Sequence, residues 1–126
     1  MVAQAREVLQ KAGVKSIRVI RVPGAFEIPA VAARLAGRRP PFSAIICLGV
    51  ILRGQTAHAQ LIAEAVSGAL AQLQIQRARP VIHEVLLLEN QAQAAARCLD
   101  KTHNRGAEAA QTALEMARIM ESLPLR

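Results

Sequence analysis

The chain has 126 residues, of which 52% are hydrophobic and 20% are charged. This length suits one domain with its own core over residues 1–126, and the composition excludes a disordered chain. No apolar run is long enough to span a bilayer, and the first residues lack the basic start and apolar centre of a secretory signal. We therefore expect a cytoplasmic protein with no membrane partner.

The formal net charge is +7 and the pI is near 11, which would suit nucleic-acid binding. The arginines are dispersed, however, and the sequence has no tryptophan or tyrosine and only two phenylalanines, so platforms for stacking bases are lacking. We favour a solvated basic surface that attracts anionic substrates, with no nucleic-acid partner. Cys47 and Cys98 lack metal-ligand spacing, so we expect buried or incidental thiols and no metal.

Three elements are predicted in the first third of the chain. A helical stripe of apolar residues predicts a helix over Val2–Ala12, which Gly13 would end. Alternating apolar and basic residues predict a strand over Ser16–Val22. A helix follows over Glu27–Leu35, because Pro29 lies in its first turn, where a missing N–H does no harm.

Strands and helices then alternate to the end of the chain. The apolar run Ala44–Val50 predicts a buried parallel strand, 3.6-residue spacing predicts a helix over Ala57–Leu73, and Pro80–Leu88 predicts another strand. Asn90 could cap a short helix that ends near Cys98, and Asn104 caps the last helix. This order predicts a three-layer α/β/α fold with a parallel sheet, although three strands are few for such a sheet.

The junction between Ala44–Val50 and the next helix is the predicted active site. A buried strand that feeds a helix through a short glycine-containing turn places backbone N–H groups at the carboxyl end of the strand, where anions are favoured. We expect Gly24–Glu27, Arg53–His58 and the end of Pro80–Leu88 to meet there.

Individual side chains at the junction allow more than one role. His58 lies at a helix start, where the dipole disfavours its protonated form, so a neutral imidazole could act as a general base and then as an acid. A surface histidine without a role is the alternative. Thr56 fits a helix N-cap or a phosphate contact. Glu27 fits either an acceptor for a polyol or a ring N–H, or a first-turn carboxylate.

Other polar residues lie outside that junction. His83, inside a strand, is expected to be a satisfied core or interface histidine. Arg97, Lys101 and Arg105 form a basic ladder that is either a solvated turn or an anion site. The sequence contains no glycine-rich phosphate loop, metal-ligand cluster or nucleophile elbow.

Three motifs resemble the lumazine synthase family, the 6,7-dimethyl-8-ribityllumazine synthases of riboflavin biosynthesis, and together they span essentially the whole chain. The motifs are Pro23–Pro29 (PGAFEIP), Leu48–His58 (LGVILRGQTAH), and Asn104–Ala110 (NRGAEAA) with Ala113–Met116 (ALEM). The resemblance implies a flavodoxin-like sheet and a transferase. This enzyme condenses 5-amino-6-(D-ribitylamino)uracil with 3,4-dihydroxy-2-butanone 4-phosphate and needs no metal or organic cofactor. The alternative is a non-catalytic or weakened relative that forms a shell or binds ligands.

The resemblance also implies roles for individual residues. His58 matches the proton-transfer group, Gly54, Gln55 and Thr56 match the turn that holds the phosphate, and Arg97 matches an arginine that reaches this phosphate from the neighbouring subunit. The resemblance also implies that Ala25, Phe26 and Glu27 grip the ribityl chain and that the backbone of Ile51 and Leu52 contacts the pyrimidine. His83 would stack on the ligand of the neighbouring subunit, and Lys101 keeps the basic character that the family has at this position.

The implied partners are the two small-molecule substrates, further copies of the chain in a homopentamer or larger shell with shared sites, and riboflavin synthase. One departure concerns the sheet. The family begins with a strand that carries a stacking aromatic residue, whereas this sequence starts at the helix after it. The resemblance places that strand between Ser16–Val22 and Ala44–Val50, so its absence predicts unpaired backbone edges there.

Overall fold

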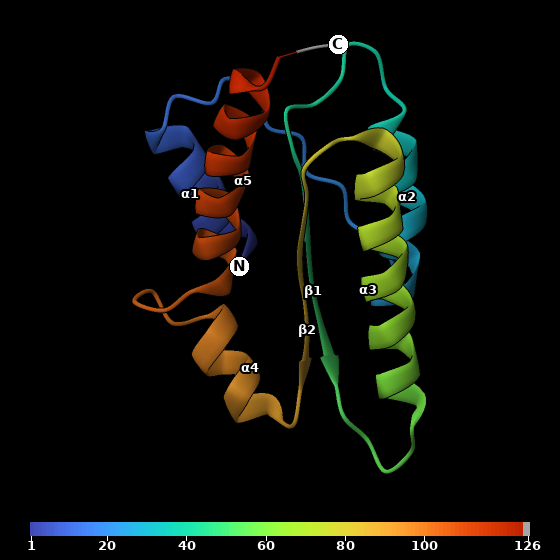
Figure 1. Cartoon of the computed structure of the whole chain (residues 1–126). Helices are drawn as coiled ribbons and strands as arrows, with labels where there is room; N and C mark the ends of the chain where they lie inside the picture. Colours follow the sequence, from blue (N-terminus) through green and yellow to red (C-terminus); the bar gives the residue numbers. More distant parts are fainter. Residues whose placement is uncertain (125–126) are drawn as a thin grey trace.

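The computed structural model describes residues 1–124 and has three layers, as the sequence predicts (Figure 1). Helices α1, α4 and α5 cover one face of a parallel sheet, and α2 and α3 cover the other (Figure 1). The elements are α1 (Val2–Lys11), the 3-10 turn η1 (Ala25–Glu27), α2 (Ile28–Ala36), β1 (Ile45–Leu52), α3 (His58–Arg77), β2 (Val81–Leu88), α4 (Gln91–Cys98) and α5 (Arg105–Ser122). Within these residues, no helix combines the length and apolar composition needed to cross a membrane.

The strands β1 and β2 run parallel and in step, from Ile45 opposite Val81 to Leu52 opposite Leu88. Beyond the last pair, the Arg53 N–H donates to the Leu88 carbonyl at 2.8 Å. Both strands therefore end at the same level, so the loops that follow them leave the sheet side by side.

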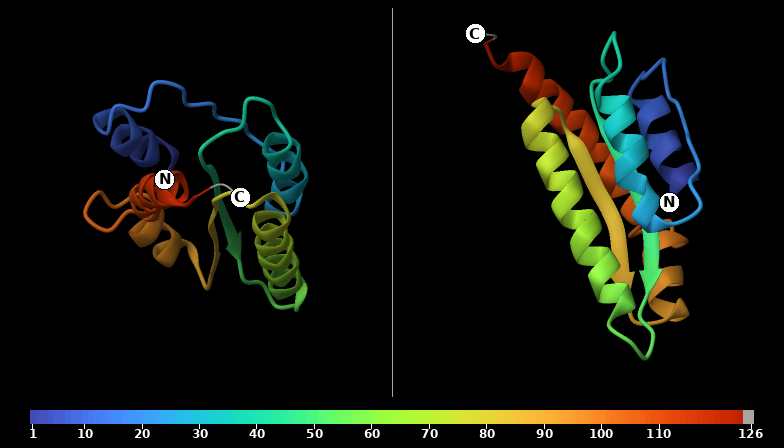
Figure 2. Two further views of the ribbon diagram at one scale, coloured as in Figure 1. Left: turned by 45° about the horizontal axis from the view of Figure 1, so that its top comes forward. Right: turned by 90° about the vertical axis from the view of Figure 1, so that its right-hand side faces the viewer.

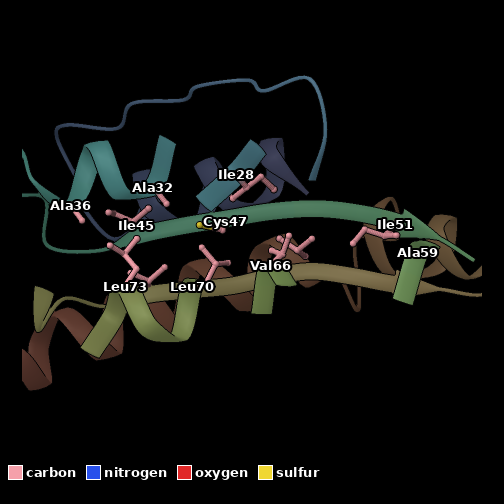
Figure 3. Packing of buried hydrophobic residues seen from close by; sticks show 12 residues of the cluster. Ile28, Ala32, Ala36, Ile45, Cys47, Ile51, Ala59, Val66, Leu70 and Leu73 are labelled. Carbon is pink, nitrogen blue, oxygen red and sulfur yellow. The ribbon is translucent and has the colours of Figure 1, made fainter. Parts of the chain in front are cut away.

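The main core fills the space between the two-stranded sheet and the layer of α2 and α3 (Figure 3). Cys47 lies in this core, and burial raises the pKa of its thiol to about 11. Cys98 is also buried and free, so the prediction of two buried thiols is confirmed. Gly49 permits the close packing at the middle of β1, because a Cβ there would lie 3.2 Å from side-chain atoms of both Ile28 and Val85.

The prediction of a strand over Ser16–Val22 is wrong. This segment crosses from α1 to α2 on the β1 side of the sheet (Figure 2), and no backbone N–H or C=O between residues 15 and 23 has a hydrogen-bond partner in the described chain. A strand needs a paired neighbour, and here a space of about 900 Å³ separates the segment from β1. The alternating pattern reflects a local preference for extended backbone. Among the described residues, no neighbouring strand pairs with this segment.

Both asparagine caps are confirmed. The Asn90 side chain accepts a hydrogen bond from the Gln93 N–H at 2.9 Å, and the Asn104 side chain accepts one from the Gly106 N–H at 2.9 Å. Asn104 is almost completely buried, and its Nδ2 donates to the Cys98 carbonyl at 2.8 Å. One amide side chain thus caps α5 and fixes the end of α4, which places the turn between them.

Candidate active site

The predicted strand–turn–helix junction is present at the carboxyl end of β1. Residues 53–57 form an exposed loop, and His58 is the first residue of the 20-residue helix α3. The His58 side chain is exposed and has no hydrogen-bond partner among the described residues. Its imidazole is therefore free to exchange a proton with a bound molecule.

The expected N-cap role of Thr56 is wrong, because Ala57 occupies the N-cap and provides no side-chain cap. The Thr56 hydroxyl instead accepts a long hydrogen bond of 3.4 Å from the His58 N–H, the two-residue turn that threonine commonly forms. The N–H groups of Ala59 and Gln60 have no partner in the described part of the chain. The start of α3 thus keeps unpaired donors, which suit an anion.

Arg53 holds the loop to its surroundings. Its Nε donates to Glu89 Oε1 at 2.7 Å, and its Nη2 donates to Gln60 Oε1 at 2.9 Å. These bonds tie the end of β1 to the residue after β2 and to the first turn of α3. Arg53 therefore shapes the loop with its charge already paired, and the anion-binding capacity at the junction comes from the backbone.

The turn η1 contacts β1 and α3, the two elements that flank the junction. Ala25 packs against the core, while Phe26 is 60% exposed and the Glu27 side chain has no hydrogen-bond partner among the described residues. The Arg53–Glu89 pair confirms that the loops after β1 and β2 meet, and η1 contacts the elements β1 and α3 that flank the junction.

Residues at the end of β1 and in the loop differ in exposure. Ile51 is buried, whereas Leu52 is 39% exposed. Gly54 and Gln55 are exposed, and a Cβ at Gly54 would meet nothing within 4 Å. The loop therefore presents open backbone to anything that binds there.

His83 is satisfied by hydrogen bonds, as expected, but it is exposed, so a core position is wrong. Its Nδ1 accepts the Val85 N–H at 3.0 Å, and its Nε2 lies 2.7 Å from the Ser67 hydroxyl. A backbone N–H needs an acceptor, so Nδ1 is unprotonated and Nε2 donates to Ser67. His83 precedes Leu88 by five residues, which at about 3.3 Å per residue is about 17 Å along the strand.

Arg97 and Lys101 lie away from the junction. Arg97 is exposed in the last turn of α4, which packs in the layer across the sheet from α3 (Figure 1). Together with Asp100, His103, Arg105 and Glu108, Arg97 lines a hollow of about 360 Å³. Lys101 is exposed in the following turn. Within one chain, the structure does not bring Arg97 and His58 together.

The members of the basic ladder differ in their pairing. Arg105 is held by two carboxylates, with Nε 3.1 Å from Glu84 Oε2 and Nη1 2.7 Å from Glu108 Oε2. Arg97 has no ion pair among residues 1–124. Asp100 accepts the N–H groups of Thr102 and His103, and these hydrogen bonds lower the pKa of its carboxyl.

Sequence reasoning missed Glu84, whose carboxylate anchors Arg105. Strand alternation is the signal that could have found it, because consecutive residues of β2 face opposite layers. His83 contacts Ser67 on α3, so Glu84 must face α5. Among the described residues, no cluster of three His, Cys, Asp or Glu side chains could hold a metal ion.

Comparisons with known proteins give one family. The sequence profile described as 6,7-dimethyl-8-ribityllumazine synthase matches residues 1–121. A protein of that name from Thermus thermophilus is 39% identical over 107 residues, which is 85% of this chain and 68% of that protein.

Proposed function

Because the chain belongs to the 6,7-dimethyl-8-ribityllumazine synthase family, a family of transferases, we propose that it catalyses the reaction of that name. The proposed substrates are 5-amino-6-(D-ribitylamino)uracil and 3,4-dihydroxy-2-butanone 4-phosphate. The product, 6,7-dimethyl-8-ribityllumazine, would be made in the cytoplasm and pass to riboflavin synthase. The observation that carries this proposal is the match over residues 1–121, which includes the exposed junction between β1 and α3.

The loop before α3 is the proposed phosphate site. Gly54, Gln55 and Thr56 are exposed, and the unpaired N–H groups of Ala59 and Gln60 lie at the start of a long helix. A phosphate dianion is stabilised by such donors and by the positive end of the helix dipole. The same donors stabilise the phosphate as it leaves, so they assist the elimination step as well as binding.

His58 is the proposed proton-transfer group. The substrate amine attacks the ketone and loses water to give a Schiff base, phosphate is then eliminated, and ring closure loses water. Each step moves a proton to or from nitrogen, carbon or oxygen. His58 has a free imidazole at the helix start beside the phosphate loop, so it can accept and return these protons.

The second substrate is assigned to the other segments at the junction. Glu27 has a free carboxylate that can accept hydrogen bonds from ribityl hydroxyl groups, and Ala25 and Phe26 complete that contact. The backbone of Ile51 and Leu52 would pair with the pyrimidine. Holding two substrates in reacting geometry supplies most of the remaining acceleration, because no cofactor is required.

Arg97, Lys101 and His83 are proposed to act on a site of a neighbouring copy. Arg97 belongs to α4, in the layer across the sheet from α3, and His83 is about 17 Å along β2 from the strand ends, so neither lies beside the junction within one chain. We infer a homopentamer or a larger shell with shared sites. Large apolar side chains on the surface favour such assembly, since Leu61 is 61% exposed and Leu99 75% exposed.

Turnover of the two substrates tests the proposal. The chain is mixed with both, and product absorbance and released phosphate are followed together. We expect stoichiometric product and phosphate, and we expect His58→Ala to slow turnover by 10²-fold or more, the order expected for loss of a general acid–base group, with the assembly state unchanged. A wild-type rate in His58→Ala would remove the proton-transfer role. Product binding without any turnover by the unmodified chain would favour the non-catalytic relative.

A further inference from the structure

His83 is exposed, yet both nitrogen atoms of its ring are bonded within the chain. Nδ1 accepts the Val85 N–H at 3.0 Å, and Nε2 donates to the Ser67 hydroxyl at 2.7 Å. While these bonds hold, the ring cannot carry protons or bind a metal ion, because each of these tasks needs a free nitrogen. The flat faces of the ring are what remain for contact with a ligand.

The Val85 N–H sets the tautomer of His83 from the free edge of β2. The carbonyls of Pro80 and Leu88 accept N–H groups of the β1 side, so the odd-numbered residues of β2 direct their backbone groups to the opposite side. Among the described residues, β2 pairs with β1 alone. The His83 ring therefore supplies the acceptor for an N–H group that no strand reaches, and it does so in the neutral form with its proton on Nε2.

Ser67 holds the same ring from a different element. It lies in the middle of α3, which packs along β2. A ring with one hydrogen bond can still turn about that bond. A ring bonded at two nitrogens to two separate elements cannot turn without breaking one of the bonds. The Ser67 hydroxyl thus fixes the plane of the imidazole, which the Val85 N–H alone leaves free.

We infer that Ser67 is a positioning residue for substrate binding: it holds the His83 ring in one orientation, with a face open to the pyrimidine ring bound by a neighbouring copy. The inference rests on the proposed function, which assigns that stacking to His83. A ring that is fixed before binding loses little freedom when the ligand arrives, so Ser67 adds to the affinity without touching the ligand.

Equilibrium binding of 6,7-dimethyl-8-ribityllumazine, which contains the pyrimidine ring, tests the inference without turnover. Ser67→Ala should raise the dissociation constant about three- to tenfold, the effect of one hydrogen bond. Ser67→Thr keeps a hydroxyl and should stay within about twofold of the unmodified chain. Ser122→Ala is the matched control and should change nothing, because the Ser122 hydroxyl bonds the Ile119 carbonyl of its own helix at 2.7 Å. The KM for the phosphate substrate should be the same in all of these variants.

A phenylalanine at position 83 shows whether Ser67 acts through the imidazole. His83→Phe keeps a flat ring that needs no partner for a nitrogen. In this background, Ser67→Ala should have no further effect on the dissociation constant. An equal loss of affinity in both backgrounds would mean that Ser67 acts by another route, and it would overturn the inference.

Hydrogen exchange gives a readout that needs no ligand. In Ser67→Ala the amide of Val85 should exchange about tenfold faster, because a mobile ring is a poorer acceptor, and Ser67→Thr should restore the slow rate. The amide of Leu86, which faces β1, is the internal control and should not change. The inference requires both the weaker binding and the faster exchange, so the absence of either overturns it. An unmodified chain that neither binds nor makes the lumazine would instead contradict the proposed function itself.

Discussion

Gly49 in β1 and Gly54 in the following loop differ in how much space surrounds them. At Gly49 an added methyl group would press on Ile28 and Val85, so glycine is required by packing. At Gly54 an added Cβ meets nothing within 4 Å, and the backbone is outside the left-handed region. Nothing within the described part of the chain requires glycine at position 54, and the open backbone there would allow the close approach of the proposed phosphate.

Gly54→Ala should therefore separate binding from folding. We expect the free energy of unfolding to change by less than about 0.5 kcal/mol, as at an unconstrained surface site. The KM for the phosphate substrate should rise several-fold, because the methyl group occupies space that the phosphate needs. Gly68→Ala is the matched control, since Gly68 lies in open space on α3. This control should leave KM unchanged and stabilise the helix by roughly 1 kcal/mol. An unchanged KM in Gly54→Ala would remove the phosphate from this loop.

Burial of the Cys47 thiol makes the free energy of unfolding depend on pH in the alkaline range. Burial raises the pKa of this thiol from 9.0 to about 11, because the thiolate is poorly solvated there. Well below pH 9, the thiol is protonated in both the folded and the unfolded state. As the pH rises from 9 to 11, the unfolded chain loses the thiol proton first, so the free energy of unfolding falls.

The expected loss over that interval is roughly 2 to 3 kcal/mol from this thiol alone. Denaturant unfolding at pH 8, 9, 10 and 11 measures it, and Cys47→Ala provides the comparison. The variant is less stable at every pH because it leaves a small cavity, but its stability should fall less between pH 9 and 11. Parallel curves for the two proteins would contradict a perturbed thiol at this position.

At the scale of elements, the end of α3 stores strain. Ala78 closes the helix in the left-handed conformation, with φ 47° and ψ 47°. An alanine Cβ is crowded in that region, at a cost of about 1 kcal/mol or more. Glycine has no such cost and is the usual residue at this position of a helix end.

Ala78→Gly is expected to raise the free energy of unfolding by up to about 1 kcal/mol, reduced by the greater freedom of glycine in the unfolded chain. The same change at Ala71, an exposed residue inside α3, should lower it by about 1 kcal/mol. Thermal or denaturant unfolding of the two variants measures this contrast. Destabilisation by both substitutions to a similar extent would contradict strain at Ala78.

The sequence predicts elements whose signals are local. The caps at Asn90 and Asn104, the strand β1 and the helix α3 all depend on signals within a few residues, and all four are present. The segment Ser16–Val22 has an equally clear pattern, but a strand also needs a partner that its own residues do not encode.

Contacts between elements were beyond prediction for the same reason. The helix α3 continues past Leu73 to Arg77, where the Gln74 side chain accepts the first N–H of β2 at 2.9 Å. The pairs Ser67–His83 and Arg105–Glu84 likewise depend on how helices align with β2. The candidate site shows the same contrast between local signals and contacts between elements. The junction at His58 was predictable from spacing, whereas the separation of Arg97 from it depends on the layer in which α4 packs.

At the scale of the whole molecule, the proposed site residues lie in two separate places of one chain. His58 and the proposed phosphate loop lie at the junction of β1 and α3, and Arg97 lies on α4 in the layer across the sheet from α3. A ring of identical subunits joins unlike surfaces of neighbouring copies, so the junction of one copy can meet α4 of the next. The proposed function therefore predicts sites shared between subunits, and mixing of defective variants can detect them.

His58→Ala and Arg97→Ala should each be slow at low concentrations of the phosphate substrate. When the two are unfolded together in equal amounts and refolded into mixed assemblies, about a quarter of the interfaces join an intact His58 to an intact Arg97. We expect the rate to rise toward about a quarter of the wild-type value, well above the mean of the two variants. In the control, His58→Ala is mixed with the double variant, which leaves every site without His58, and no activity should return. A mixture that shows only the mean of its components would place both residues in the same subunit's site or remove Arg97 from catalysis, and either result would contradict the shared site.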